Sequence, residues 1–339
     1  MKKFNIAIVG ATGLVGSTVL KILEERNIPI NALGLFASKN SVGTILSFKG
    51  KNYSVQELKE TSFDSGYDFA IFTANTETSK IYAPIAVKKG CIVIDNSSYF
   101  RMDNDVPLVV PEVNFEDALN HKGIIANPNC STIQAMLPLK ALDDKYKIKR
   151  IIFSTYQAVS GAGKEALLDL KNIDNTKPLK KFNYPIYNNC IPHIDEFLDN
   201  GYTKEELKMI NETRKILHNP NLKITATTVR VPVSNSHSES INVEFENAFD
   251  LDELKNALAN FENIILLDTP KENIYPMPIN ANGYDEVFVG RIRRDESIDF
   301  GINLWVVADN IRKGAATNAV QIMEKLIEFN NKEVNLWKK

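Results

Sequence analysis

The stretch "FNIAIVGATGLVGSTVLKILEER", residues 4–26, decides the fold of the N-terminal part of the chain. Its first six residues form a short apolar run with β-branched side chains, and the residues from Leu14 onward place apolar side chains at helical spacing. Gly10, Gly13 and Gly16 lie between the two patterns as GxxGxxG. Glycines at this spacing also occur by chance. A strand before them and a helix after them nevertheless predict a dinucleotide site, because the backbone amides of such a turn hold a pyrophosphate.

Short apolar runs continue beyond this unit. They recur at residues 30–38, 68–74, 91–98 and 107–113, and residues 78–90 have the pattern of a helix between two of them. Strand-like runs that alternate with helices predict a parallel sheet covered on both faces.

The pattern changes near residue 129. The later strand-like runs are longer and alternate more clearly, at residues 150–159, 222–233, 238–246 and 299–309. Residues 250–261 read as a helix, and residues 312–331 read as one terminal helix. We therefore expect an α/β chain in which a Rossmann-type domain is followed by an α+β domain with a mixed sheet.

Composition limits the classes of partner. The chain has 339 residues, 44% of them hydrophobic, which is enough for two domains with cores of their own. Forty basic and 42 acidic residues without a block of like charge give no footprint for nucleic acid or a membrane surface, so a small molecule is the expected partner.

The cysteines and the N-terminus indicate a cytoplasmic location. Three widely spaced cysteines argue against a disulfide framework, and four histidines without a CxxC or HExxH motif argue against a metal site. The apolar run at the N-terminus is too short, and too soon interrupted by glycine, for a signal sequence or a membrane span.

The end of the second strand-like run bears on the choice of cofactor. There is no acidic residue from Pro29 to Gln56, although an NAD site usually places an Asp or Glu here for the ribose hydroxyls. The run ends instead in Ser38, Lys39, Asn40 and Ser41, whose hydroxyls, amide and cation suit a 2′-phosphate. NADP is therefore favoured over NAD, and an uncharged surface loop is the alternative interpretation.

Cys130 lies in "ANPNCSTIQAM", residues 126–136. Pro128 disfavours helix for the residue before it, and helical spacing resumes after the cysteine, so Cys130 should lie in the first turn of a helix. A thiolate is stabilised at that position, which favours a nucleophile. The alternative is a small buried apolar residue, the usual role of a free cysteine and the one we expect for Cys91 and Cys190.

A cysteine nucleophile needs a proton partner, and His237 is the best of the four histidines. It lies in a polar loop between two strand-like runs, seven residues after Arg230. His121 and His218 lie in polar turns, and His193 follows a proline at an apparent helix start.

Seven motifs in order give the chain a family resemblance: "GATGLVG", "DNSSYFRMDNDVPLVVPEVN", "NPNCSTIQ", "YQAVSGAG", "IPHID", "VRVPV…H" and "DNIRKGAA". From Asn5 to about Gln321 the chain resembles the aspartate-β-semialdehyde dehydrogenase family. The resemblance implies an NADP-binding Rossmann domain of residues 1–128 with the C-terminal helix 311–330, and a catalytic and dimerisation domain of residues 129–310. It also implies a homodimer, or a tetramer of paired dimers.

The family interconverts L-aspartate 4-semialdehyde, phosphate and NADP⁺ with L-4-aspartyl phosphate and NADPH. It runs toward the semialdehyde in the biosynthesis of lysine, threonine, methionine and isoleucine. By position, the resemblance makes Cys130 the nucleophile, His237 the general acid/base and Gln157 a residue that orients the substrate. Arg230 matches the bidentate ligand of the substrate carboxylate, a task that suits arginine better than lysine.

The resemblance assigns three further substrate contacts and a cofactor set. Glu205 matches the ligand of the substrate amino group, and Lys208 and Arg101 match the phosphate ligands; without the resemblance all three would be ordinary surface charges. The expected cofactor contacts are Gly10, Thr12, Gly13, Leu14, Val15, Gly16, Ser38, Lys39, Asn40, Ser41, Ser160, Gly161, Ala162, Gly163 and Asn310.

The chain departs from the family pattern at two places. Asn40 stands where an arginine commonly contacts the 2′-phosphate, which weakens the preference for NADP unless Lys39 substitutes. Asn75-Thr76 replaces a common Gly-Gly near the cofactor.

Three other functions are weighed against this one. N-acetyl-γ-glutamyl-phosphate reductase shares the chemistry, but the "EELK…R…VPV…H" arrangement fits the shorter, amino-bearing substrate better. A non-enzymatic homologue would not need Cys130, Gln157, Arg230 and His237 together. A cysteine hydrolase without a cofactor would leave the glycine loop unexplained.

Overall fold

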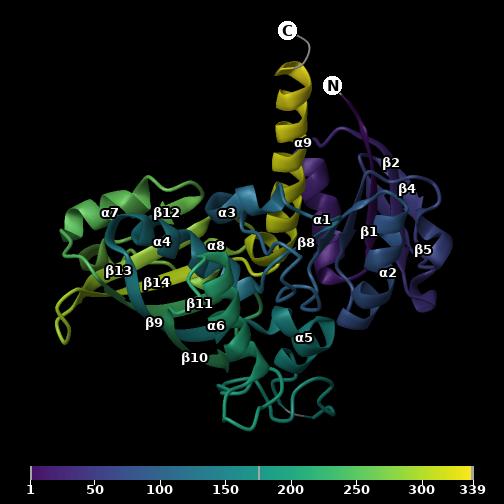
Figure 1. Cartoon of the computed structure of the whole chain (residues 1–339). Coiled ribbons are helices and arrows are strands. Elements are labelled where there is room, and N and C mark those ends of the chain that lie inside the picture. The colour runs from purple at the N-terminus through teal and green to yellow at the C-terminus, as the bar shows by residue number, and fades with distance from the viewer. Residues whose placement is uncertain (1, 175, 337–339) are drawn as a thin grey trace. The chain divides into compact units, whose positions relative to one another are not determined.

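The computed structural model describes residues 2–174 and 176–336, and the chain forms two compact units (Figure 1). The first unit contains the residues up to Pro128 together with those from Ala315 on, and the second unit is Asn129–Gly314. No helix within the described ranges is long and apolar enough to cross a bilayer.

The first unit contains a six-stranded sheet in the order β5-β2-β1-β6-β7-β8, and every neighbouring pair is parallel. The strands are β1 Phe4–Val9, β2 Ile30–Ala37, β5 Gln56–Glu57, β6 Phe69–Phe72, β7 Ile92–Asp95 and β8 Ile124–Ala126. A two-stranded hairpin, β3 Ile45–Phe48 with β4 Lys51–Ser54, follows β2 in the chain. The predicted parallel sheet is confirmed.

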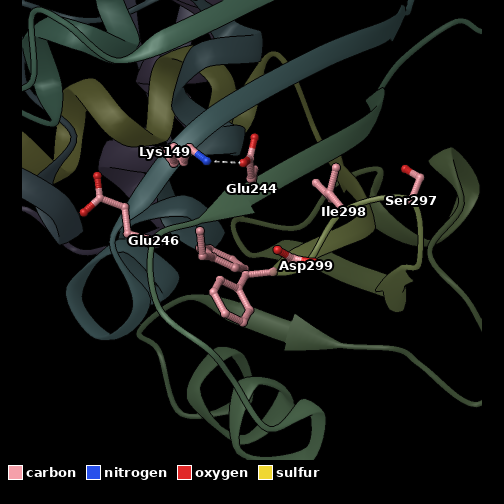
Figure 2. A pocket seen from close by; sticks show the side chains of 8 residues that line it. Lys149, Glu244, Glu246, Ser297, Ile298 and Asp299 are labelled. Atoms are coloured by element: carbon pink, nitrogen blue, oxygen red, sulfur yellow. Dashed lines mark hydrogen bonds and ion pairs between the residues drawn. The ribbon is translucent and has the colours of Figure 1, made fainter.

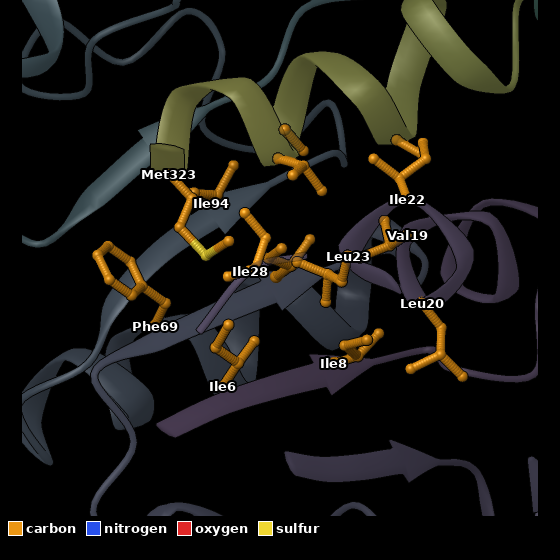
Figure 3. Packing of buried hydrophobic residues seen from close by; sticks show 14 of the residues in the cluster. Ile6, Ile8, Val19, Leu20, Ile22, Leu23, Ile28, Phe69, Ile94 and Met323 are labelled. Atoms are coloured by element: carbon orange, nitrogen blue, oxygen red, sulfur yellow. The ribbon is translucent and has the colours of Figure 1, made fainter. Parts of the chain in front are cut away.

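Helices cover both faces of this sheet. They are α1 Leu14–Glu25, α2 Thr76–Lys88, α3 Pro111–Ala118 and α9 Asn318–Leu336, with the short turns η1 Lys39–Ser41 and η2 Glu60–Phe63. Because strand side chains alternate, Ile6 and Ile8 point to one face, where they pack with Leu23 of α1 and Met323 of α9 (Figure 3). Phe36 and Phe72 point to the other face, where both rings contact Phe63.

One expectation about the first unit is wrong. Residues 107–113 do not form a strand: Leu108 makes only an isolated bridge to Ala126, and Pro111 begins α3. The run contains two prolines, which cannot donate to a strand ladder, and a proline suits the first position of a helix. The terminal segment is helical as predicted, and its first turn, Arg312–Thr317, is π-helical before α9 begins.

The glycine turn between β1 and α1 is closely packed. Gly10 has a φ of 84°, and a Cβ on Gly16 would lie 2.3 Å from the carbonyl oxygen of Gly10. Larger residues would therefore open the turn. Gly13 is the N-cap of α1 and brings no side chain to cap the first-turn amides.

The second unit has a mixed sheet in the order β10-β9-β11-β14-β13-β12. The strands are β9 Ile148–Gln157, β10 Lys223–Arg230, β11 His237–Phe245, β12 Ile264–Leu266, β13 Val287–Asp295 and β14 Gly301–Ala308. The two outer pairs, β10-β9 and β12-β13, are parallel, and the inner pairs are antiparallel. This confirms the predicted α+β fold with a mixed sheet.

One face of the mixed sheet is covered by α4 Cys130–Tyr146, α6 Lys204–Ile216 and α7 Leu251–Ala259. The shorter helical elements are α5 Lys164–Leu170, α8 Pro278–Ala281, η3 Val159–Ala162 and η4 Pro270–Glu272. Ile151 and Phe153 of β9 and Ile241 of β11 point to the covered face and are fully buried, whereas Tyr156 on the other face is 39% exposed. The second face of the sheet is therefore partly open within one chain.

Asn75, part of the departure from the family's Gly-Gly, has a defined role in this chain. It is the N-cap of α2, and its side-chain oxygen accepts the backbone N–H of Thr78 at 2.9 Å. The departure therefore supplies a helix cap in this loop.

We expect Asn75→Ala to lower the free energy of unfolding by about 1 kcal/mol, because the Thr78 N–H loses its acceptor. Asn75→Asp keeps an acceptor at the same place and should stay near the parent. Urea unfolding of the three proteins measures the difference. Equal midpoints for the Ala and Asp variants would show that the cap adds nothing to stability.

Candidate active site

Cys130 is the first residue of α4, and the residue before it holds the helix terminus. The Oδ1 atom of Asn129 accepts the backbone N–H groups of Ser131 at 2.9 Å and Thr132 at 3.4 Å. Cys130 itself is partly exposed. A thiol at this position meets the positive end of the helix, which favours its ionised, nucleophilic form.

His237 faces this thiol. Its Nε2 atom lies 3.2 Å from the Sγ atom of Cys130, and its Nδ1 atom accepts the backbone N–H of Ala158 at 2.9 Å. The ring is fully buried. Ser236, directly before it, has a φ of 74° and donates its backbone N–H to Asn310 at 2.9 Å. The imidazole is therefore fixed by bonds to its ring and to its adjoining backbone.

Arg230, at the end of β10, is tied to the same backbone residue. Its Nη1 atom donates to the carbonyl oxygen of Ala158 at 2.7 Å. Burial lowers the pKa of Arg230, while the charges of Glu205 and Cys130 raise it. Burial, and to a smaller extent the charge of Arg230, hold the pKa of His237 well below its usual value. The imidazole is therefore neutral near neutral pH.

Glu205 is a buried, ionised carboxylate at the start of α6. Its Oε1 atom accepts from Asn129 Nδ2 at 2.8 Å and Gln157 Nε2 at 3.3 Å, and its Oε2 atom accepts from Lys208 Nζ at 3.1 Å. Burial alone would raise the pKa of Glu205, but the charge of Lys208 and the three hydrogen bonds outweigh it and lower the pKa. Gln157 also donates to the hydroxyl of Thr155 at 3.3 Å.

Lys208 bridges two carboxylates. Besides Glu205 it contacts Asp195, at 2.7 Å. Burial alone would lower the pKa of Lys208, but the two carboxylates outweigh it and raise the pKa. The ammonium group therefore stays charged.

The second unit thus brings together six of the residues predicted from the sequence: Cys130, Gln157, Glu205, Lys208, Arg230 and His237. The cluster combines a thiol, a buried cation, a buried anion and a neutral hydrogen-bonding ring. Such a set can bind a zwitterion while the sulfur attacks an electrophilic carbon.

Glycine backbone lies against this cluster in two places. A Cβ on Gly161 would lie 3.3 Å from Arg230 Nη1 and 3.4 Å from His237 Nε2, and a Cβ on Gly314 would lie 3.0 Å from the Cβ of Cys130. Gly314 belongs to the π-helical turn, a feature often found at functional sites. Both positions leave space that a side chain would fill.

The remaining predicted residues of this unit support the loops around His237. Asn310 is 2% exposed, and its amide nitrogen donates to the hydroxyl of Ser160 at 3.0 Å. Ala162 ends η3, and Gly163, with a φ of 95°, is the N-cap of α5. Asn310 therefore anchors both Ser160 and the backbone before His237.

The first unit holds the other predicted cofactor residues. Leu14 begins α1 and Val15 follows it; the hydroxyl of Thr12 donates to that of Ser41 at 3.2 Å, which connects the glycine turn to the end of β2. Ser38, Lys39 and Asn40 are exposed there. No side chain caps the first backbone amides of α1, and the glycine turn beside them is closely packed. These features suit the binding of a pyrophosphate.

Arg101, the predicted phosphate ligand of the first unit, is 8% exposed. Its Nε atom donates to the carbonyl of Asn127 at 3.0 Å and its Nη2 atom to the carbonyl of Asn96 at 2.8 Å. These bonds fix the guanidinium at the carboxyl ends of β7 and β8.

Sequence reasoning missed several residues of the site. Asn129 could have been found, since Asn is a preferred N-cap and precedes the predicted helix. The peptide of Ala158 acts through its backbone, which leaves no signal in the residue type. Glu212, whose carboxylate accepts the Asn129 N–H at 2.7 Å, lies 83 residues away in the chain and has no local signal.

Glu239 is another residue that sequence reasoning missed. It lies two residues after His237 on the same face of β11, opposite Thr155, and is fully buried. Neither of its carboxyl oxygens has a hydrogen-bond partner in the part of the chain that the structure describes. Burial, and to a smaller extent the charge of Glu205, hold the pKa of Glu239 well above its usual value. The carboxyl group is therefore protonated near neutral pH.

A separate open pocket of about 550 Å³ lies at the other end of β11 (Figure 2). Lys149 and Glu244 form an ion pair beside it, and Glu246 and Asp299 also line it. Its lining contains none of the predicted site residues.

Family models match both units. The model of the semialdehyde dehydrogenase NAD binding domain matches residues 5–121, and that of the semialdehyde dehydrogenase dimerisation domain matches residues 139–313.

Individual relatives match nearly the whole chain. Aspartate-semialdehyde dehydrogenase of Aquifex aeolicus is 56% identical over 337 residues, 96% of this chain and 98% of the relative. The crystal structure of aspartate semialdehyde dehydrogenase II of Vibrio cholerae complexed with ASA is 46% identical, has a TM-score of 0.92, and covers 97% of this chain and 99% of its own. The Candida albicans aspartate semialdehyde dehydrogenase solved with NADP is 26% identical, has a TM-score of 0.76, and covers 95% of this chain and 98% of its own.

We expect the parent protein to lose stability as the pH rises, and we expect Glu239→Gln to lose less. The folded chain keeps a proton on Glu239 that the unfolded chain releases above the ordinary carboxyl pKa. The stabilising contribution is complete below that pKa and is lost as the pH rises toward the folded pKa, by about 1.4 kcal/mol per unit of difference. Urea midpoints between about pH 5 and pH 8 should therefore fall less in the variant.

Glu246→Gln is the matched control, because Glu246 is exposed just beyond the end of the same strand. It should follow the parent curve. Parallel curves for the parent and Glu239→Gln would mean that Glu239 is ionised in the folded protein.

Proposed function

The chain belongs to the aspartate-semialdehyde dehydrogenase family, an oxidoreductase family, and on that premise we propose that Cys130 is the nucleophile that converts L-4-aspartyl phosphate to L-aspartate 4-semialdehyde. The observation that carries the proposal is the 3.2 Å contact between the Sγ atom of Cys130 and Nε2 of His237 at the N-terminus of α4. A thiol at a helix start beside a buried imidazole is suited to nucleophilic catalysis.

The charged residues around the thiol suit the two ends of an amino acid. Arg230 would bind the α-carboxylate, since its one bond to Ala158 fixes the guanidinium plane without using all five donors. Glu205 would bind the ammonium group, and Gln157, which contacts Glu205, would orient the substrate. The Vibrio cholerae relative complexed with ASA supports this substrate class.

Lys208 and Arg101 would hold the phosphate group. The raised pKa keeps Lys208 cationic beside Glu205 and Asp195. A cation next to the departing phosphate stabilises the charge that develops on its oxygens, a kind of interaction that often makes the largest contribution to catalysis.

In the proposed reaction the Cys130 thiolate attacks the acyl carbon, the bond from that carbon to the phosphate oxygen breaks, and a thioester remains. The glycine turn would hold a reduced nicotinamide, and the chemistry that this cofactor would supply is hydride donation to the thioester carbon. The resulting oxyanion then expels the sulfur, which gives the aldehyde and restores the thiolate. The one proton taken up overall ends on the released phosphate.

The cofactor is proposed to be NADP(H). The first unit belongs to an NAD binding domain family, and the exposed Ser38, Lys39 and Asn40 with Ser41 offer a cation and polar groups at the end of β2. The Candida albicans relative solved with NADP supports the same choice. Lys39 would take the part of the arginine that Asn40 replaces.

A homodimer is supported by the dimerisation domain in the second unit. We propose that it forms through the open face of the mixed sheet. Tyr156 and Trp305, whose rings are 5.4 Å apart, lie on that face.

A role in amino-acid biosynthesis is consistent with the family, and the cytoplasmic location remains a prediction.

The activity can be tested directly. The purified protein should reduce NADP⁺ when aspartate semialdehyde and phosphate are both present, and omission of phosphate should stop the reaction. Cys130→Ala should lower the rate by more than about a thousandfold, because the thioester cannot form. Cys190, which we expected to be buried, is exposed, and Cys190→Ala should leave the rate unchanged. No absorbance change with either nicotinamide would refute the proposed function.

The cofactor preference can be tested separately. We expect a higher kcat/KM with NADP⁺ than with NAD⁺, and Lys39→Ala should lower the NADP⁺ value about tenfold by removing a charge-assisted contact of about 1.4 kcal/mol. The NAD⁺ value should not change, and Asn40→Arg should raise the preference for NADP⁺. Lys51→Ala, on exposed β4, is the control. A strong preference of the parent for NAD⁺ would overturn the cofactor assignment.

A further inference from the structure

Lys208 is held by two carboxylates of unlike exposure. Its Nζ atom lies 2.7 Å from Asp195 Oδ2 and 3.1 Å from Glu205 Oε2. The side chain of Glu205 is 6% exposed, whereas those of Asp195 and Lys208 are 31% and 25% exposed. The ammonium group therefore lies between a buried carboxylate of the active site and a more open one, and it is nearer the open one.

Asp195 ends the motif "IPHID" and has an unusual backbone conformation. Its φ is 68°, in the left-handed region, which Asp and Asn adopt more readily than other residues with side chains. Its Oδ1 atom accepts the backbone N–H of Glu196 at 2.9 Å, and its Oδ2 atom accepts from Lys208. Burial alone would raise the pKa of Asp195, but the hydrogen bond and charge of Lys208 outweigh it and lower the pKa. The carboxylate is therefore ionised and oriented by a bond to its own backbone.

The segment that contains Asp195 is fixed on both sides. Before it, the N–H and the carbonyl of Ile191 bond to the backbone of Arg230, at 2.9 and 2.8 Å. After it, the carbonyl of Glu196 accepts the N–H of Lys204, the first residue of α6, at 2.9 Å. The segment thus connects the strand end that carries the site's arginine to the helix that carries its lysine. Asp195 holds the ammonium group from a fixed place.

Without the Asp195 carboxylate, Lys208 would have Glu205 as its remaining anionic partner. The lysine side chain is a point charge on a flexible stem, so it would move toward the anion that is left. The cation would then cover the carboxylate that the substrate ammonium group is proposed to use. It would also turn away from the phosphate group.

We propose that Asp195 is a positioning residue, which holds the Lys208 ammonium group clear of Glu205 and directs its third N–H to the phosphate group. The inference rests on the proposed function, in which Lys208 binds phosphate and Glu205 binds the substrate ammonium group. An ammonium group has three donors, and two of them have acceptors among the residues that the structure describes. The third is available for a phosphate oxygen. Asp195 acts through Lys208 and contacts no reacting atom.

The sign of the effect on phosphate binding separates positioning from simple repulsion. Asp195 is an anion near the proposed phosphate site, so loss of its charge alone would strengthen phosphate binding. Asp195→Asn can keep the left-handed backbone and the bond to Glu196, but it presents an amide NH₂ group to Lys208, which cannot accept. We expect this variant to bind inorganic phosphate about tenfold more weakly, the loss that accompanies one charge-assisted hydrogen bond. Phosphorus NMR titration of the full chain measures the affinity.

A double-mutant cycle shows whether Asp195 acts through Lys208. In a Lys208→Ala background there is no ammonium group to position, so Asp195→Asn should leave the phosphate affinity unchanged or raise it. The same loss in both backgrounds would mean that Asp195 acts without the lysine. Unchanged or stronger phosphate binding by Asp195→Asn in the parent background would mean that Asp195 does not position Lys208. Each of these results would overturn the proposal.

Glu196→Gln is the matched control. Glu196 is the next residue along the chain, and its carboxylate pairs with exposed Lys204. The substitution removes the same charge from the same segment and should keep the phosphate affinity within about twofold of the parent, because solvent screens exposed charges. Urea midpoints of Asp195→Asn and Glu196→Gln should both stay near the parent value. A tenfold loss of phosphate affinity in both variants would assign the effect to the charge of the segment and overturn the positioning role.

Turnover gives a second readout. Asp195→Asn should raise the KM for phosphate, and also the KM for aspartate semialdehyde because Lys208 then competes with the substrate ammonium group for Glu205. The KM for NADP⁺ should not change. Equal changes in all three Michaelis constants would indicate a general disturbance of the fold and contradict the proposal.

The phosphate titration requires neither the semialdehyde nor the cofactor. A protein that binds phosphate through Lys208 and Asp195 but does not turn over aspartate semialdehyde would refute the function and leave the positioning role standing. An active protein in which Asp195→Asn binds phosphate as well as the parent does would leave the function standing and refute the positioning role.

Discussion

The site depends on one backbone residue at the end of β9. The N–H of Ala158 donates to His237 at 2.9 Å and its carbonyl accepts from Arg230 at 2.7 Å, so the two sides of one residue fix the ring and the cation. The backbone at this buried strand end has little freedom to move, so its two hydrogen bonds hold the His237 ring and the Arg230 guanidinium in place. The contact between the ring and Cys130 also requires α4 to begin at this residue. Asn129 sets that start, because it caps the helix and also donates to Glu205.

Two buried carboxyl groups with opposite protonation states surround this arrangement. Glu205 is ionised because Lys208, Asn129 and Gln157 satisfy its oxygens. Glu239, two residues beyond His237 on β11, has no hydrogen-bond partner among the described residues and keeps its proton. A second anion so close to the first would have little to balance it in a medium of low dielectric constant. The neutral state of Glu239 therefore leaves the negative charge of the site on Glu205, which is where the proposed ammonium group would bind.

Local patterns predicted the parts of the structure that depend on neighbours in the chain. The strand, glycine turn and helix at the N-terminus follow from residues 4–26, and the position of Cys130 at a helix start follows from Pro128 and the helical spacing after it. The contacts of Glu205 with Asn129 and Gln157 join residues 76 and 48 positions apart, and no local pattern encodes them. The family resemblance supplied Glu205 and Gln157 but not Asn129. Neither source could supply the hydrogen bond from Ala158 to the His237 ring, because its donor is a backbone N–H that every residue except proline possesses.

The buried charge of Glu205 also bears on the choice between aspartyl phosphate and an N-acetylated acyl phosphate. Ionised Glu205 has three donors in the free site, and a substrate ammonium group would add a charged fourth. An N-acetyl group brings an uncharged amide with a single N–H and additional bulk, so it would place apolar atoms beside a carboxylate that is 4% exposed. A hydrogen bond from an ammonium group to a carboxylate is stronger than one from a neutral amide, so a free amino group gains a contact that the N-acetyl group lacks. In the proposed complex, Glu205 therefore favours a substrate with a free amino group.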